Sequence, residues 1–352
     1  MVSGMKQFGR VACVACALAI NASFAISHRA LGEERDLAAS NPLLSNVVAA
    51  FESLPTEGRL LQFKPDVAAI ARGGHFQGIQ LRFDAGRNRN VAFLSHDSET
   101  IAYLVVAQFP AGLSGDGRAI RIHTLPSDGK SPPLRHGGGI QLVGDILVIG
   151  LEDNQQKTRS EIQFWNVSNP DDVVQLKHLT IRRSGEPKDK TAGAVGMVQR
   201  EKDHRLAVAN WDSRAIDFYV SNGKPLDDPQ CQFLLDARWQ VDLSDKRGWK
   251  PDRAFGAYQS INLVSDTDRN LFLIGFHTDS GNKDLADLFS IDPKQVPSRL
   301  LQKLASKQIK LQGDNHFQFS GGVWIDRDKL GILSSERDFG PAVRINVAMG
   351  EK

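Results

Sequence analysis

The chain has 352 residues, with 43 lysines and arginines against 41 aspartates and glutamates, and a formal net charge of +2 at pH 7. A chain so close to neutrality lacks the global field that draws proteins onto nucleic acid or anionic membranes, so its composition argues against both partners. Its length allows a core large enough to support the fold without covalent cross-links.

The first 25 residues have the pattern of a secretion signal. Lys6 and Arg10 precede an apolar run over residues 11–20 (VACVACALAI), and Ser23-Phe24-Ala25 supplies the small residues that signal peptidase needs. The run is too short to span a bilayer, which takes about 20 apolar residues. We therefore predict that residues 1–25 are removed and that the protein is secreted or periplasmic.

Removal of this segment changes the cysteine and charge balance. Cys13 and Cys16 would leave with it, so Cys231 alone would remain and no internal disulfide could form. Lys6 and Arg10 are its only charged residues, so the mature chain would carry 41 basic and 41 acidic residues. No second apolar run approaches membrane-spanning length.

Residues 26–58 form an N-terminal segment with one helical pattern. Asn41 can cap a helix, Pro42 suits its first position, and one apolar stripe follows: Leu44, Val47, Val48, Phe51 and Leu54. A second short helix is expected over residues 296–306. Nearly all the remaining sequence consists of short β-rich runs separated by Gly, Asp, Asn and Pro.

These runs recur as pairs of strands joined by a polar turn. The pairs are 78–81 with 91–97, 139–142 with 146–153, 195–198 with 206–212, 260–263 with 271–277, and 321–324 with 330–336. A period of about 60 residues with several strands per unit is typical of propeller blades. We expect an all-β fold, a five-bladed β-propeller over residues 59–352 with a short N-terminal helix. Six or seven blades, or a β-sandwich, are the alternatives.

Each unit also offers a third strand and, in four units, an outer one. The third strands are expected at 119–125, 161–167, 215–220, 286–291 and 342–347, and outer strands at sites such as 174–181 and 231–239. First strands crowd around the axis, which favours the small residues found there: Gly78, Gly139, Gly196, Ser260 and Gly322. The last unit lacks a fourth strand, and residues 59–63 (RLLQF) could supply it and close the ring.

One segment resembles a known family. Residues 162–170 (IQFWNVSNP), followed by Val174 and Leu176, resemble the LVIVD-type repeat of bacterial secreted propellers, with partial echoes at 218–223 and 288–293. The close match covers one blade of the five. The resemblance implies a surface or periplasmic β-propeller, often of unassigned function, and it carries over no catalytic residue.

Strand register predicts a ligand-binding face. The start of strand one and the end of strand two of a blade lie at the same end of the propeller, because these strands are antiparallel. The residues at these positions are His75, His96, Asp97, His136, Glu152, Asp153, Trp211, Asp212, His277, Asp279, Glu336 and Asp338.

A divalent cation could bind on this face, held by His75, His136, Glu152 and Asp212. Oxygen ligands favour calcium, the first choice here, whereas added imidazoles favour zinc or iron. In the competing interpretation, these aspartates only stabilise turns. An Asp side chain at the end of a strand hydrogen-bonds to the turn backbone, and a repeated sequence places such an Asp in every unit.

Familiar catalytic motifs are missing. His136 to Gly139 (HGGG) resembles the oxyanion loop of some esterases, but the chain has no G-x-S-x-G turn, so tight turning into a strand explains these glycines better. Two functions remain. The first is a binding module for a protein, glycan or small molecule; the alternative is a metal-assisted hydrolase or lactonase. A glycosidase is weaker, because first strands carry Gly, Gln and Asn instead of paired carboxylates.

Overall fold

A computed structural model describes residues 43–65, 73–250 and 254–350. The chain divides into two units, Met1–Ala38 and Ala39–Lys352, and every described residue belongs to the second. The predicted secretion signal lies outside the described residues. Within them, no helix combines the length and the apolar character needed to cross a bilayer.

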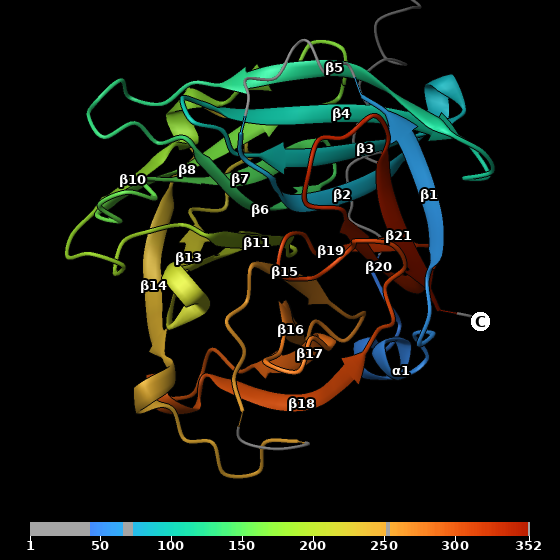
Figure 1. The fold of residues 1–352 in the computed structure, drawn as a ribbon. Helices are drawn as coiled ribbons and strands as arrows, with labels where there is room; N and C mark the ends of the chain where they lie inside the picture. The colour runs from blue at the N-terminus through green and yellow to red at the C-terminus, as the bar shows by residue number, and fades with distance from the viewer. Residues whose placement is uncertain (1–42, 66–72, 251–253, 351–352) are drawn as a thin grey trace, which may run out of the picture. The chain divides into compact units, whose positions relative to one another are not determined.

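The described strands form antiparallel meanders (Figure 1). The first contains β2 (Phe76–Asp84), β3 (Arg89–His96), β4 (Ala102–Pro110) and β5 (Gly117–Leu125). The second contains β6 (His136–Val143), β7 (Ile146–Glu152), β8 (Arg159–Asn166) and β10 (Ile181–Ser184), with the short β9 (Val174–Gln175) beside β8. The third contains β11 (Ala194–Gln199), β12 (His204–Ala209), β13 (Ala215–Ser221) and β14 (Phe233–Gln240).

Two further meanders complete the set. The fourth contains β15 (Ser260–Ser265), β16 (Leu271–Thr278), β17 (Asp284–Ile291) and β18 (Leu301–Gln308). The fifth contains β19 (Gly322–Asp326), β20 (Lys329–Ser335) and β21 (Val343–Met349). Its fourth strand is β1 (Arg59–Lys64), which pairs antiparallel with β21 from Arg59 opposite Val347 to Phe63 opposite Val343. A two-residue parallel contact between β1 and β5 joins the last meander to the first.

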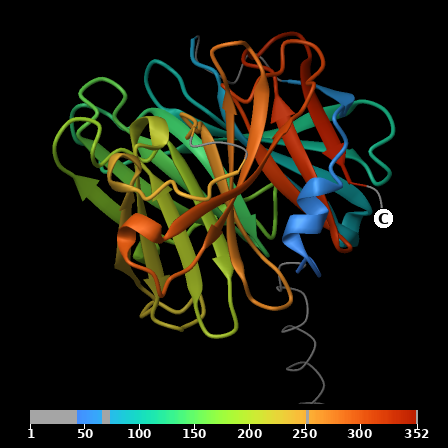
Figure 2. The ribbon, with the colours of Figure 1, turned by 90° about the horizontal axis from the view of Figure 1, so that it is seen from below.

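The innermost strands of the meanders surround a common centre. Strand β2 contacts β6, β6 contacts β11, β11 contacts β15, β15 contacts β19, and β19 contacts β2. Figures 1 and 2 show the meanders arranged around these strands. A closed circle of first strands with antiparallel sheets radiating from it is a β-propeller. The fold is therefore all-β, as the strand rhythm predicted.

Three buried amides, Gln80, Gln141 and Asn262, fill the centre and tie the inner strands together. Gln80 accepts from the backbone N–H of Leu142 at 3.2 Å. Gln141 accepts from the backbone N–H groups of Met197 and Leu263, each at 2.8 Å. Asn262 donates to the carbonyl of Ile140 at 3.1 Å and accepts from the N–H of Val323 at 2.7 Å. These bonds link strands that no sheet joins, so the first strands are held in fixed relative positions.

The close approach of these strands requires glycine. A Cβ on Gly322 would lie 1.9 Å from the carbonyl oxygen of Ile79, and one on Gly78 would lie 2.7 Å from the backbone nitrogen of Ile140. No side chain fits at such distances. The small residues that the sequence places at the starts of first strands are there because neighbouring backbones pack directly on them.

The helix α1 (Val47–Glu52) is shorter than the apolar stripe suggested. Asn46 caps it by accepting from the N–H of Ala49 at 2.9 Å, so the helix begins several residues after Asn41. Val47 and Phe51 are buried, and α1 packs against β18 and β20. The helix thus shares one hydrophobic cluster with the fourth and fifth meanders.

Two expected elements were wrong. The run 119–125 belongs to the outer strand β5, and the third strand of that meander is β4, which the repeat comparison passed over. Residues 296–306 contain a 3-10 turn over Pro297–Arg299 and then β18, where Leu301 and Lys303 are buried against β17 and Gln302 is exposed. Pairing with β17 overrides the local helical pattern there.

Candidate metal centre at the axial rim

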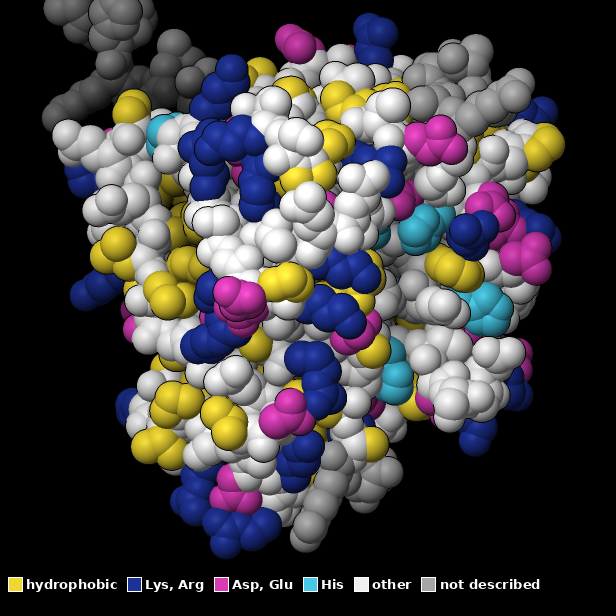
Figure 3. Space-filling view, turned by 60° about the vertical axis from the view of Figure 1, so that its left-hand side comes forward, with side chains coloured by type: hydrophobic (Ala, Val, Ile, Leu, Met, Phe, Trp, Pro, Cys, Tyr) yellow, Lys and Arg dark blue, Asp and Glu magenta, His cyan; other side chains and the backbone are white. Residues whose placement is uncertain are grey.

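Three predicted rim residues come together from the first two meanders. His75 precedes β2, Asp97 follows β3, and His136 begins β6. One ligand atom from each lies within 4.8 Å of the other two. The antiparallel register explains the meeting, because Phe76 pairs with His96 and His136 pairs with Glu152 at the same end of the propeller. Figure 3 shows histidine side chains on one face of the molecule, among acidic and basic ones.

A glycine turn holds His75 against Asp97. Gly73 and Gly74 have φ of 84° and 86°, a region that favours glycine, and a Cβ on Gly74 would lie 2.1 Å from the carbonyl oxygen of Asp97. The N–H of His75 donates to Oδ1 of Asp97, and the N–H of Asp97 donates to the carbonyl of His75 at 3.0 Å. Backbone and side chain are therefore fixed together.

The donor spacing suits a small divalent ion. Nδ1 of His75 lies 3.0 Å from Oδ1 of Asp97, and Nε2 of His136 lies 4.0 Å from Oδ2 of the same carboxylate. Donors placed tetrahedrally around zinc at about 2.1 Å are roughly 3.4 Å apart. The donors, which lie within 4.8 Å of one another, would have to move closer together by up to roughly 1.4 Å to reach that spacing.

Glu152 anchors the second nitrogen of His136. Its Oε1 lies 3.1 Å from Nδ1 of His136, and its Oε2 accepts from the N–H of Ala192 at 2.8 Å. The contact falls outside hydrogen-bond geometry, so the carboxylate acts on His136 mainly through its negative charge. The Glu152 side chain is only 1% exposed, against 10% for His136. Such a carboxylate keeps the proton on Nδ1 and leaves the Nε2 lone pair for a metal.

Gln77 lies against the second ring nitrogen of His75. Its side-chain amide contacts Nε2 of His75, while its own Oε1 has no hydrogen-bond partner among the described residues and Gln77 is 2% exposed. With the amide nitrogen toward Nε2, the proton of His75 sits on Nδ1 and faces Asp97. If the amide turns over, its oxygen accepts a proton from Nε2 and the Nδ1 lone pair becomes free to bind a metal.

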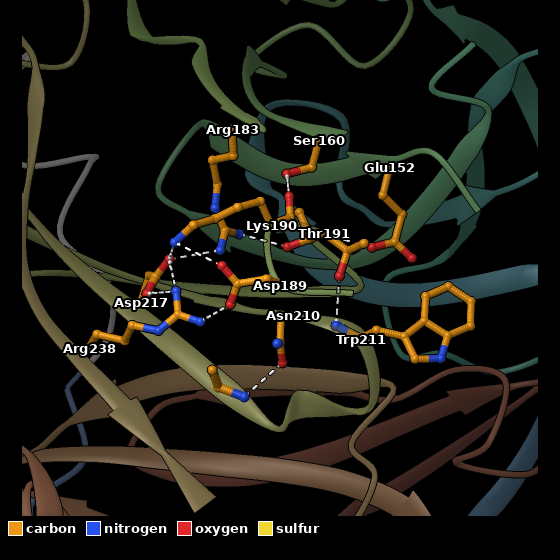
Figure 4. Close-up of polar contacts among 12 residues, drawn as sticks. Glu152, Ser160, Arg183, Asp189, Lys190, Thr191, Asn210, Trp211, Asp217 and Arg238 are labelled. Atoms are coloured by element: carbon orange, nitrogen blue, oxygen red, sulfur yellow. Dashed lines mark hydrogen bonds and ion pairs between the residues drawn. The ribbon is translucent and has the colours of Figure 1, made fainter. Parts of the chain in front are cut away.

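The segment that holds Glu152 is itself fixed by a buried network (Figure 4). The hydroxyl of Ser160 donates to the carbonyl of Lys190 at 2.5 Å, and Arg183 donates to the carbonyl of Thr191 at 2.7 Å. Arg183 also contacts Asp217 at 2.8 Å, and both side chains are almost fully buried. The N–H of Ala192 is thus presented to Glu152 from a rigid segment.

The carboxylates and imidazoles of the cluster shift each other's pKa values toward the charged forms. Burial alone would raise the pKa of Asp97, but the hydrogen bond and charge of His75, together with His136, outweigh it and lower that pKa. Burial alone would lower the pKa of His136, but the carboxylates of Glu152 and Asp97 outweigh it and raise that pKa. The cluster therefore attracts positive charge, whether a proton or a metal ion.

Three of the predicted rim residues have other tasks. His96 is 1% exposed and packs edge-on against Phe76 and Phe339, and burial lowers its pKa to about 4. It is a neutral core residue. Asp153 accepts from the N–H groups of Gln155 and Gln156, each at 2.9 Å, and Asp279 does the same for Gly281 and Lys283. These two carboxylates shape turns, the interpretation that competed with a binding face.

The rest lie in ion pairs or at the edge of the cluster. Glu336 pairs with Arg344, Asp338 with Arg337, and His277 with Asp287. Trp211 lies beside His136 with its ring centroid 6.4 Å away. Asp212 is exposed at a φ of 56° and is not among the converging donors, so Asp97 takes the place that the sequence analysis gave to Asp212.

Two imidazoles and one carboxylate favour zinc, iron or manganese over calcium, which takes six to eight oxygen ligands. The expectation of calcium rested on a ring of rim carboxylates, and the structure does not assemble that ring. Gln77 was missed because a single glutamine in a strand gives no signal; its role depends on which side chains the fold brings to His75.

Comparisons with known proteins give coarse matches. No family model matches the chain, and no curated protein matches it. Among solved structures, a GH62 α-L-arabinofuranosidase catalytic domain from Coprinopsis cinerea has 10% identity and a TM-score of 0.48 over 84% of this chain and 98% of its own. An endo-arabinase from Bacteroides thetaiotaomicron has 7% identity and a TM-score of 0.48 over 82% and 97%. An α-L-arabinofuranosidase from Podospora anserina, in complex with cellotriose, has 11% identity and a TM-score of 0.47 over 85% and 99%. Scores and identities at this level carry no argument about what this chain does.

Proposed function

We propose that this β-propeller is a metal-dependent hydrolase, with a divalent transition-metal ion held by His75, Asp97 and His136. One observation carries the proposal. The three donors converge within 4.8 Å, and both imidazoles have the second ring nitrogen in contact with a buried side chain, Gln77 or Glu152. Outer-shell partners of this kind orient and activate metal ligands.

The number of donors favours catalysis over a purely structural ion. Structural zinc sites are closed by four protein ligands, whereas catalytic sites have three and leave one position open. The described residues bring three donors together, and the His75 side chain is 24% exposed, so solvent can reach the group. A simple binding module, the first reading of the sequence, would not require such an open site.

The residues of this chain have distinct tasks in the proposal. A bound ion would polarise a carbonyl or phosphoryl oxygen and make a water molecule more acidic. His75, Asp97 and His136 would hold that ion, and Glu152 would keep Nε2 of His136 deprotonated. Asp97, whose pKa is lowered, would stay ionised and able to bind the ion.

Three finer proposals accompany this function. We propose that the five meanders make a complete five-bladed ring that β1 closes, that α1 belongs to the mature protein, and that the chain is exported. Deletion of residues 26–64 should then leave β21 without its partner and abolish cooperative melting. The resemblance of residues 162–170 to LVIVD-type repeats is consistent with export and stays a prediction.

Chelation and reloading test the function. The purified chain would be stripped with EDTA and reloaded with zinc, manganese or iron(II), then assayed on p-nitrophenyl acetate, γ-butyrolactone and p-nitrophenyl phosphate. We expect at least one substrate to be hydrolysed only by the reloaded protein. Asp97→Asn and His136→Gln should lose that activity, whereas the outlying His178→Gln should keep it. Activity that survives full chelation, or that no metal restores on any substrate, would contradict the proposal.

A further inference from the structure

Lys157 occupies an unusual position beside the candidate metal centre. Its Nζ lies 3.6 Å from the ring centroid of Trp211, and the ring of Trp211 lies 6.4 Å from that of His136. Lys157 belongs to the turn between β7 and β8, and Glu152 is the last residue of β7 before that turn. Trp211 belongs to the turn between β12 and β13. Two neighbouring meanders thus bring an amine and an indole to the edge of the cluster.

The amine has no acidic partner. Among the residues that the structure describes, no carboxylate lies within ion-pair distance of Lys157, although the side chain is partly buried. A lysine normally extends its charge into water or pairs it with an acid. Here the charge is held on an aromatic face, a cation–π contact that positions the amine without neutralising it.

Both partners of this contact are fixed in place. The carbonyl of Lys157 accepts from the N–H of Lys188 at 2.7 Å, and the backbone of Lys157 has a φ of 60°, which few non-glycine residues adopt. The N–H of Trp211 donates to the hydroxyl of Thr191 at 2.6 Å, in the same segment that holds Glu152 (Figure 4). The amine is therefore held on a fixed indole near His136.

The charge balance of the site indicates what it would bind. With a divalent ion in place, the carboxylates of Asp97 and Glu152 offset the charge of the ion, whereas none of the described carboxylates forms an ion pair with Lys157. Arg135, which directly precedes His136, is a second cation here; it donates to the carbonyl of Glu99 and to Oδ1 of Asn154 and forms no ion pair among the described residues. An amine without an ion-pair partner near a bound metal ion would attract an anion to the site.

We infer that the substrate carries an oxyanion, a carboxylate or a phosphate group, and that Lys157, held on Trp211, binds it next to the metal ion. This inference rests on the proposed metal-dependent function and assigns its substrate class. Lys157 is a substrate-binding residue in this account, and Trp211 is its positioning residue.

Anion binding by the metal-loaded protein tests the inference without any activity assay. Protein loaded with manganese and freed of excess metal would be titrated calorimetrically with inorganic phosphate and, separately, with acetate; the two arms distinguish the two oxyanions. We expect one of them to bind, Lys157→Met to weaken it by tenfold or more, and Lys157→Arg to retain binding within about threefold. Trp211→Leu should also weaken it, because the amine loses its platform.

The control and the order of measurements separate the possible failures. Lys202→Met removes the same charge from the turn between β11 and β12, at the opposite end of the strands from His136, and should bind the anion as the wild type does. Metal content and melting temperature are measured first on each variant. A wild type that holds no metal overturns both proposals. A metal-loaded wild type that binds neither anion, or a folded Lys157→Met that binds as tightly as wild type, overturns the inference alone.

Discussion

Two histidine–aspartate clusters in this propeller look alike in sequence but differ in construction. One is the candidate metal centre, where Asp97 lies between His75 and His136. The other lies in the fourth meander, where Nε2 of His277 is 3.4 Å from Oδ2 of Asp287. That same oxygen is 2.9 Å from Nζ of Lys303 and accepts from the hydroxyl of Tyr258 at 2.6 Å.

The difference lies in which cation each carboxylate has. Burial alone would raise the pKa of Asp287, but His277, Lys303 and the hydroxyls of Ser306 and Tyr258 outweigh it and lower that pKa. Lys303 is a permanent counter-charge, 4% exposed, so this cluster needs no metal. Among the described residues, no lysine or arginine pairs with Asp97. The two clusters therefore differ in whether a permanent cation neutralises the carboxylate.

Breaking the pair in the fourth meander should produce the largest effect on stability. Lys303→Met would leave the buried Asp287 carboxylate without its cation, and the free energy of unfolding should fall by about 3–5 kcal/mol, with or without metal. Urea unfolding measures this. The double variant Lys303→Met with Asp287→Asn should recover much of the loss, because it removes the orphaned charge. A loss below about 1 kcal/mol in the single variant would show that Lys303 is not the structural counter-charge.

Acid should destabilise the folded protein by protonating the buried ring of His96. Burial lowers the pKa of His96 to about 4 from 6.5, so the unfolded chain binds more protons than the folded one between these values. The stability that the neutral ring contributes is complete above pH 6.5 and is lost as the pH falls toward 4, at a cost of about 3 kcal/mol.

The control for this acid effect is His96→Phe, which keeps the aromatic packing and removes the titration. Burial also lowers the pKa of His204 to about 4 and lowers the pKa of His123, so the variant should lose part, but not all, of the acid sensitivity between pH 6.5 and 4. Stability curves from urea unfolding at several pH values would show this. If both proteins lose stability equally, His96 is not a neutral core residue.

The smallest expected effect concerns the second nitrogen of His136. Glu152→Gln keeps the shape of the side chain but removes the charge that holds the proton on Nδ1, and the dissociation constant for metal should rise by 10- to 100-fold. Calorimetric titration with zinc measures it. The matched change in the other cluster, Asp287→Asn, should leave zinc affinity unaltered once the folded fraction is taken into account. Equal zinc affinity in Glu152→Gln and wild type would show that Glu152 does not support metal binding by His136.

The repeat rhythm was a good guide to the fold because one structural rule acts in every meander. Each first strand packs on its neighbours around the centre, so small residues such as Gly78 and Gly322 recur at a spacing visible in the sequence. Elements set by pairing with another strand were harder to predict. The repeat pattern did not predict β4, the third strand of the first meander. The sequence of β18 has a helical pattern, which its pairing with β17 overrides.

Strand register predicted which residues of the candidate site lie at the same end of the propeller, but it did not predict the directions of their side chains. Register brings His75, Asp97 and His136 to one end, and all three were singled out from the sequence. It could not tell that Asp212 turns outward or that His96 turns into the core. The contacts of Gln77 and Lys157 depend on side-chain directions and on a neighbouring meander, which no periodicity encodes.

Metal binding by the purified chain is the most direct test of the central claim. Metal-stripped wild type, His136→Gln and His277→Gln would be titrated with zinc and manganese, with unfolding followed in parallel. We expect one ion per wild-type chain and a stabilisation of about 2.7 kcal/mol at a hundredfold excess over the dissociation constant. His277→Gln should keep both and His136→Gln should lose both. A wild type that binds no ion, or a His136→Gln variant that binds as the wild type does, would contradict the account.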